Sequence, residues 1–293
     1  MQHCQRATLK VRFHTTGRIQ GVAYLDDVVS KIYAVCESCS TVNVFHAMPP
    51  YEQLRGIHVS GLRGPTDIVA CTTNRLLYVS DQVEACVWQV TTGGKADWHD
   101  LTWSPTKRKA SSVFPVSLSV RRGRLVVVEV RNVLIYDLHG SKLDEIKFAD
   151  FITLRHAVES DRQSVMVALS DSSEHTDSSL IQEMRSDASR KWSPVRQWNL
   201  TSSNPGQPLY MAWDMLGFLH VSIHNSCKVL VLDSALNEVQ SVRLNRRSMP
   251  SQLCCLSQRR KLFLTVAFGA EVRMYGDVIS SMLYPEIQRN VTL

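Results

Sequence analysis

Residues 64–90 read GPTDIVACTTNRLLYVSDQVEACVWQV, and this stretch decides the fold. Three short apolar segments, 64–70, 76–81 and 86–90, are separated by polar residues at 72–74 and 82–85. The segments are rich in Val, Leu, Ile and Tyr, and the chain has no convincing long stripe of apolar residues at 3.6-residue spacing. This pattern predicts β-strands rather than helices.

The same unit of three segments recurs along the chain, with a period of about 46 residues. A large apolar residue ends the third segment of most copies, and the intervals between these residues are 43, 48, 96 and 43 for Phe45, Trp88, Tyr136, Leu232 and Tyr275. The interval of 96 covers two periods, because the fourth copy, at 154–169, lacks this marker. The chain therefore contains six copies of one unit.

A more polar segment follows several third segments, at 51–57, 96–101 and 238–244. Each copy is therefore predicted to be a four-stranded antiparallel sheet with a polar outer strand, and the fold class is all-β, a six-bladed β-propeller of four-stranded antiparallel blades. We expect one propeller domain over residues 1–280 and a C-terminal tail over 281–293. The alternating strand at 7–13 is predicted to close the last blade; the alternative is that 282–287 takes that place.

The second copy carries a family resemblance. Its Gly64-Pro65, Asp67-Ile68-Val69 and Leu77-Tyr78-Val79-Ser80-Asp81 are similar to an NHL repeat, in which Pro-x-Gly-Ile-Ala-Val precedes Ile-Tyr-Val-Ala-Asp. Two departures are Asp67, where the family has Gly, and residues 82–86, which replace its Asn-His-Arg-Ile run. The chain thus resembles an NHL-like or TolB-like propeller, as in TRIM-NHL proteins but without RING, B-box or coiled coil, so ubiquitin-ligase activity is not implied.

Composition and charge exclude several classes of protein. The 293 residues are 44% hydrophobic and 20% charged, which excludes a disordered or coiled-coil chain, and the formal net charge of +6 permits an acidic partner without requiring one. No apolar run reaches the roughly 18 residues of a membrane span, and the first fifteen residues carry no signal-peptide core. We expect a cytoplasmic monomer with no membrane association.

No motif in the chain predicts catalysis, and we expect no enzyme activity, no metal and no cofactor. Cys36 and Cys39 have the spacing of half a zinc site, but no second pair matches, so free thiols are expected. His220 and His224 share a strand face without an evident carboxylate nearby. The innermost strands are expected to line the channel mostly with apolar or small residues: Val22, Ala23, Val69, Ser117, Ala157, Met211 and Cys254.

Basic residues supply the candidate binding site. In the usual propeller order, one face carries the connections between blades and the turns joining second to third strands; we call it the loop-rich face. The candidate ligand-binding residues on it are Arg55, Arg63, Lys107, Arg108, Lys109, Arg131, Arg246 and Arg247. The sequence thus predicts a non-catalytic platform for protein or peptide partners. The alternative is single-stranded RNA, which TRIM-NHL propellers bind and for which Trp98 and Trp103 lie near Lys107. A metal-dependent hydrolase would require three or more ligands converging in the channel.

Overall fold

The structure is a computed structural model of the whole chain. It describes residues 4–6, 8–26, 29–92, 115–150, 152–160, 164–171, 178–200, 209–214, 216–223, 228–244, 252–258, 261–268 and 271–276. In this part of the chain the regular elements are β-strands, arranged in six sheets.

The first three sheets follow each other along the chain, and the strand order within each is the order in the sequence. Their strands are β3 (Ile19–Leu25), β4 (Lys31–Cys36), β5 (Thr41–His46) and β6 (Gln53–His58); β7 (Pro65–Cys71), β8 (Leu76–Asp81) and β9 (Cys86–Thr91); and β10 (Ser117–Arg121), β11 (Arg124–Val128), β12 (Asn132–Asp137) and β13 (Lys142–Lys147).

The other three sheets contain the second half of the chain and its N-terminal strands. Their strands are β14 (Ile152–Glu159), β15 (Ser164–Asp171), β16 (Ser178–Ser186) and β17 (Trp192–Leu200); β18 (Leu209–Trp213), β19 (Leu219–Ile223), β20 (Lys228–Leu232), β21 (Glu238–Arg243) and β1 (Cys4–Arg6); and β22 (Gln252–Gln258), β23 (Lys261–Phe268), β24 (Glu271–Gly276) and β2 (Thr8–His14).

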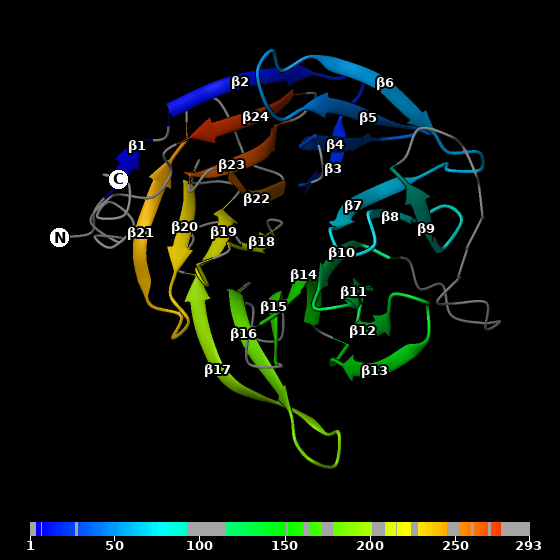
Figure 1. Ribbon diagram of the computed structural model, residues 1–293. Coiled ribbons are helices and arrows are strands. Elements are labelled where there is room, and N and C mark those ends of the chain that lie inside the picture. Colours follow the sequence, from blue (N-terminus) through cyan, green and yellow to red (C-terminus); the bar gives the residue numbers. More distant parts are fainter. Residues whose placement is uncertain are drawn as a thin grey trace.

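The sheets lie radially around a common centre, with β3, β7, β10, β14, β18 and β22 innermost (Figure 1). The chain is therefore an all-β propeller with four-stranded antiparallel blades. Five sheets have the four antiparallel strands of a complete blade in the described residues, whereas β7–β9 has three. The prediction of six four-stranded blades thus counts one complete blade too many for this part of the chain. The fourth strand expected at 96–101 lies outside the described residues.

The N-terminal segment joins two different sheets. Strand β2 pairs antiparallel with β24, at the place for which the sequence favours 7–13, while the alternative at 282–287 lies outside the described residues. The sequence gives no sign of β1, which pairs in parallel with β21 and adds a fifth strand to the preceding sheet. The N-terminal strand β2 and the last described strand, β24, are therefore held in one sheet.

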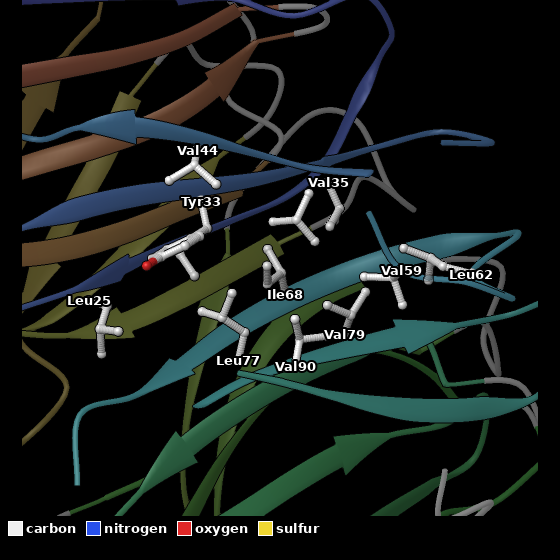
Figure 2. Packing of buried hydrophobic residues seen from close by; sticks show 12 residues of the cluster. Leu25, Tyr33, Val35, Val44, Val59, Leu62, Ile68, Leu77, Val79 and Val90 are labelled. Atoms are coloured by element: carbon white, nitrogen blue, oxygen red, sulfur yellow. The ribbon is translucent and has the colours of Figure 1, made fainter. Parts of the chain in front are cut away.

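Adjacent sheets pack face to face through apolar side chains. Figure 2 shows the cluster between β3–β5 and β7–β9, in which Tyr33, Val44, Ile68 and Leu77 are buried. At Gly21 the two innermost strands approach so closely that an added Cβ would lie 2.6 Å from the backbone nitrogen of Ile68. Only glycine fits here, because the atom it would meet is backbone and cannot rotate away.

Asp81 fastens the connection between the first two sheets. Its carboxylate accepts backbone N–H bonds from Arg63 at 2.8 Å and Gly64 at 3.0 Å, which precede β7. It also accepts the N–H groups of Val83 and Glu84 in the β8–β9 turn and the indole N–H of Trp88 at 3.2 Å. One buried side chain thus satisfies five donors from three segments.

Among the described residues no helix is long and apolar enough to cross a bilayer.

Candidate functional site

A cavity of about 470 Å³ lies at the centre of the propeller. It is lined by the six innermost strands and the turns that follow some of them: Val22, Ala23, Tyr24, Asp67, Ile68, Val69, Ala70, Thr72, Leu118, Ser119, Val120, Arg121, His156, Val158, Glu159, Tyr210, Met211, Ala212, Trp213, Asp214, Gln252, Leu253 and Cys254. Asp67, His156 and Gln252 are buried, whereas Arg121 and Trp213, at the ends of β10 and β18, are partly exposed. The cavity thus has a buried polar floor. It opens at the face that carries the turns between first and second strands, which we call the hairpin face.

The floor is formed by the residues at one equivalent position of each of the six innermost strands. Pairing with the second strands places Ile68 opposite Val79, Ala157 opposite Val167 and Met211 opposite Val221. The residues just before these aligned positions, taken over all six sheets, are Gly21, Asp67, Ser117, His156, Tyr210 and Gln252. This is the position at which an NHL repeat has Gly. The floor residues other than Gly21 therefore lie at the position where this chain differs from the NHL pattern.

The channel was expected to be lined mostly by apolar or small residues. This prediction is wrong at the floor of the cavity. Val22, Ala23, Val69, Met211 and Cys254 do border the cavity, but so do polar side chains from the alternate positions. An innermost strand has no neighbour on its channel side, so residues from both of its faces reach the channel. The equivalent positions in the looser copies are defined by the strand pairing, so the floor was not evident from sequence.

Asp67 bridges two sheets through backbone donors. Its Oδ1 accepts the N–H of Ile68 and its Oδ2 the N–H of Leu118 on β10, both at 2.8 Å. Burial raises the pKa of Asp67 to about 7, although both of these hydrogen bonds favour the carboxylate and lower it. Asp67 therefore gains or loses its proton near neutral pH. Its side chain lies against the channel-side edge of β10.

His156 faces the same strand from the other side. Burial lowers the pKa of His156 to about 4, against a smaller raising effect of a hydrogen bond to the Leu118 backbone. The ring is therefore neutral at physiological pH, and its Nδ1 has no hydrogen-bond partner in the described structure. The ring lies beside Tyr210, with 5.5 Å between ring centroids.

Tyr210 and Gln252 complete the floor. Burial raises the pKa of Tyr210, the negative charge of Asp67 raises it further, and a side-chain hydrogen bond with Gln252 opposes both effects. The amide nitrogen of Gln252 donates to the carbonyl of Thr66 at 3.3 Å, so this side chain reaches past β3 to β7. Gly21 occupies the intervening position on β3 and has no side chain to obstruct it. The Oε1 of Gln252 has no partner in the described structure.

The open end of the cavity carries an arginine on an aromatic ring. The guanidinium carbon of Arg121 lies 5.5 Å from the ring centroid of Trp213, within the range of a cation–π contact. Arg121 also donates to the backbone carbonyl of Glu159 at 3.2 Å. Burial raises the pKa of Glu159, and the ion pair with Arg124 opposes this shift. The negative charge of Glu159 is therefore balanced by Arg124 in the wall of the cavity.

No metal centre is formed by the described residues, in which no three His, Cys, Asp or Glu side chains are grouped suitably. Cys36 and Cys39 are free thiols, the first buried and the second partly exposed. His220 has a carboxylate partner that sequence reasoning missed: its Nε2 lies 3.0 Å from Asp214 Oδ2, and both side chains are fully buried. His224 lies outside the described residues. The His220–Asp214 pair joins the β18–β19 turn to β19, which is a structural contact.

The structure describes three of the eight basic residues predicted to bind a ligand. Arg55 is exposed on β6, on the outer edge of its sheet. Arg63 and Arg131 are exposed on the loop-rich face, and each has an acidic partner: Arg63 Nε lies 3.1 Å from Glu84, and Arg131 Nη1 lies 2.6 Å from Asp150. The other five lie outside the described residues: Lys107, Arg108, Lys109, Arg246 and Arg247. None of the three described residues borders the central cavity.

Fold and cavity together define a β-propeller with a buried polar floor in its central channel. No family model and no curated protein matches the sequence. Solved structures match the fold. Hydrazine synthase from Kuenenia stuttgartiensis matches with a TM-score of 0.61 and 14% identity, over 89% of this chain and 84% of that one.

Two further neighbours have the same fold. Virginiamycin B lyase from Staphylococcus aureus matches with a TM-score of 0.59 and 7% identity, over 91% of this chain and 98% of that one. A protein from Lactobacillus plantarum matches with a TM-score of 0.57 and 13% identity, over 87% of each chain. At these identities the likeness establishes the propeller fold alone, and the NHL resemblance stays a prediction.

Proposed function

We propose that this chain is a non-catalytic interaction platform that binds protein or peptide partners through the loop-rich face of a six-bladed ring. The sheet β7–β9 is the blade that brings the count to six. Its innermost strand, β7, contacts β3 of the preceding sheet and β10 of the following sheet, as expected for a blade between its two neighbours in sequence. The proposed compartment is the cytoplasm and the proposed assembly a monomer.

The observation that carries this proposal is a pair of exposed valines on neighbouring sheets. Val83 in the β8–β9 turn is 63% exposed, and Val130 in the β11–β12 turn is 43% exposed. Both turns join second to third strands, so both valines lie on the loop-rich face, beside the ion-paired Arg63 and Arg131. Apolar side chains rimmed by charged pairs suit a protein surface, whose interfaces have an apolar centre and a polar rim.

The same ion pairs favour a protein over RNA. An arginine that is already ion-paired with a carboxylate has fewer free N–H donors and less unbalanced charge for a phosphate. A carboxylate on the binding face also repels a polyanion. Arg63 and Arg131, the two described candidate residues on this face, have such partners. RNA binding therefore rests on the five basic residues that lie outside the described part of the chain.

Asp67, the acidic group of the floor, fits a structural role. Each of its oxygens accepts a backbone N–H, and the hydrogen bonds tie this carboxylate to the edge of the next blade. Hydrazine synthase and virginiamycin B lyase are enzymes, but identities of 14% and 7% carry no catalytic residue over to this chain.

The test is crosslinking capture from the native source with three baits: the wild type, the double variant Val83→Asp/Val130→Asp, and Leu216→Asp. Leu216 is 40% exposed in the β18–β19 turn on the hairpin face, so it is a matched control. We expect a protein that the wild type and Leu216→Asp retain and the double variant loses. Equal recovery by all three baits would contradict the proposal.

A parallel titration with labelled polyuridine distinguishes the RNA alternative. A dissociation constant that weakens more than about tenfold between about 50 and about 200 mM salt indicates phosphate contacts. Loss of that binding when Lys107, Arg108, Lys109, Arg246 and Arg247 are all replaced by Ala would favour RNA over a protein partner. Absence of salt-sensitive binding is the result we expect.

A further inference from the structure

The central cavity has the size and shape of a small-molecule site. Its volume of about 470 Å³ falls within the roughly 300–1,000 Å³ of pockets that enclose small ligands. Its floor is buried, and its open end lies on the hairpin face, opposite the face proposed for protein partners. The cavity is therefore separate from the surface proposed for those partners.

The walls above the floor include Thr72, Ser119, Arg121, Glu159 and Asp214, but apolar and aromatic side chains provide the larger share of the lining surface. Val69, Val120 and Met211 come from three different sheets, and Tyr24 and Trp213 stand at the ends of β3 and β18. The guanidinium of Arg121 packs against one face of the Trp213 ring. Such walls favour a ligand with a flat apolar body, since aromatic side chains give large contact areas at low conformational cost.

The floor is polar but carries little net charge. His156 is neutral because burial lowers its pKa to about 4, and the pKa of Asp67, raised by burial to about 7, leaves this group partly protonated. The Arg124–Glu159 pair balances the acidic group nearer the open end. An ion entering this space would lose its hydration without a full opposite charge to replace it, so the floor selects against charged ligands.

At the floor, Ser117 Oγ has no partner but Ser117 does not line the cavity; two acceptors of floor residues that do line it also have no partner in the described structure. They are Gln252 Oε1 and His156 Nδ1; the second is an acceptor because the neutral ring uses its other nitrogen toward Leu118. Buried polar atoms without partners are rare and costly, so each favours a ligand that supplies the missing donor. A small rotation of either side chain would turn its acceptor toward a bound group.

We propose that the central cavity binds an uncharged aromatic molecule, whose ring lies among Val69, Val120, Met211 and Trp213 and whose N–H or O–H group donates to Gln252 or His156. The apolar walls provide contact area for the ring, and the floor fixes its orientation. The site is independent of the valine pair on the loop-rich face.

The test uses three probes of nearly equal shape: benzamide, benzoate and benzylamine, which are neutral, anionic and cationic at neutral pH. Saturation-transfer NMR detects binding, and titration gives the dissociation constants. We expect benzamide to bind with a dissociation constant of about 1 mM or tighter and both charged probes to bind at least about tenfold more weakly. Equal affinity for all three would overturn the assignment of a neutral ligand, and no binding of any probe would overturn the site.

Cavity-filling variants locate the binding. Ala212→Phe and Ala70→Leu each place bulk on a partly exposed wall residue, and Ala235→Leu adds bulk to an exposed turn as the control. We expect benzamide binding to fall at least about tenfold in both wall variants and to remain in the control. Circular dichroism identifies which variants fold, and two different wall positions ensure that one misfolded variant does not decide the outcome. Unchanged binding in a folded wall variant would overturn the proposal.

Discussion

Asp67 on β7 reaches across to the next blade, where its Oδ2 accepts the backbone N–H of Leu118 at 2.8 Å. The innermost strand of a blade has an unpaired edge, and an unpaired edge leaves backbone donors without partners. A side chain from the neighbouring blade satisfies one of them here. The contact links the stability of the ring to the protonation of one buried carboxyl group.

Asp67 and His156 should oppose each other in the pH dependence of stability. The pKa of Asp67 is raised from 3.8 to about 7, so between these values the folded state binds more protons than the unfolded state and stability falls as pH rises. The pKa of His156 is lowered from 6.5 to about 4, so its contribution to stability rises with pH over nearly the same range. The two slopes cancel in the wild type between about pH 4 and 6.5.

Single variants should expose each slope. Urea unfolding between pH 4 and 8 should show stability rising with pH in Asp67→Asn, where His156 acts alone, and falling in His156→Gln, where Asp67 acts alone. Each slope approaches 1.4 kcal/mol per pH unit at most. Parallel profiles for the wild type and both variants would refute the opposed shifts.

Asp81→Ala should be among the most destabilising single substitutions. It leaves five donors without their acceptor: the Asp81 side chain is fully buried, and the donors, among them the indole N–H of Trp88, are partly buried. Each buried unsatisfied donor costs about 1–3 kcal/mol, and relaxation toward water reduces the total, so we expect a loss of about 3–5 kcal/mol in urea unfolding. Asp187, which accepts bonds in an exposed turn, provides the control: Asp187→Ala should cost clearly less.

Gly21→Ala should destabilise the propeller although it adds one methyl group. The new Cβ would lie 2.6 Å from the nitrogen of Ile68 and 2.9 Å from the carbonyl carbon of Asp67, so two innermost strands would have to separate. Overpacking of this kind costs about 1–3 kcal/mol. Gly123→Ala is the control, because its Cβ would meet nothing within 4 Å and it tests only the cost of a positive φ. A larger thermal shift for Gly123→Ala than for Gly21→Ala would contradict this account.

Removal of residues 1–14 should disturb the last blade, because β24 would lose β2 and expose an unpaired edge. We expect lower recovery of monomer in size-exclusion chromatography and a lower melting temperature. Removal of residues 1–6 deletes only β1 and should have a smaller effect. Equal behaviour of the two truncated chains would show that β2 is dispensable.

Most of the strands could be predicted from sequence because alternation and turn residues are local signals. The predicted strands at 64–70, 76–81 and 86–90 correspond closely to β7, β8 and β9. Strand β1 could not be predicted, since three residues pairing in parallel with β21 leave no local pattern. For the same reason the pairing of His220 with Asp214 was missed: it depends on how a turn folds back on its strand.

The floor of the cavity was only half visible in the sequence. Asp67 stood out as a departure from the glycine of the NHL pattern, but one departure does not indicate a ring of side chains. Tyr210, His156 and Gln252 lie in looser copies, where the register could not be fixed without the pairing of the strands. The perturbed pKa values of His156 and Tyr210 arise from burial at the centre, a property of the assembled ring.

The pairing of β2 with β24 also constrains how the chain can fold during synthesis. A strand near the beginning of the chain has its partner near the end, so it must remain unpaired while the intervening blades form. The last blade then becomes complete only after translation has passed residue 276. Until then β2 has no partner strand, and an unpaired strand edge is the kind of surface that promotes aggregation.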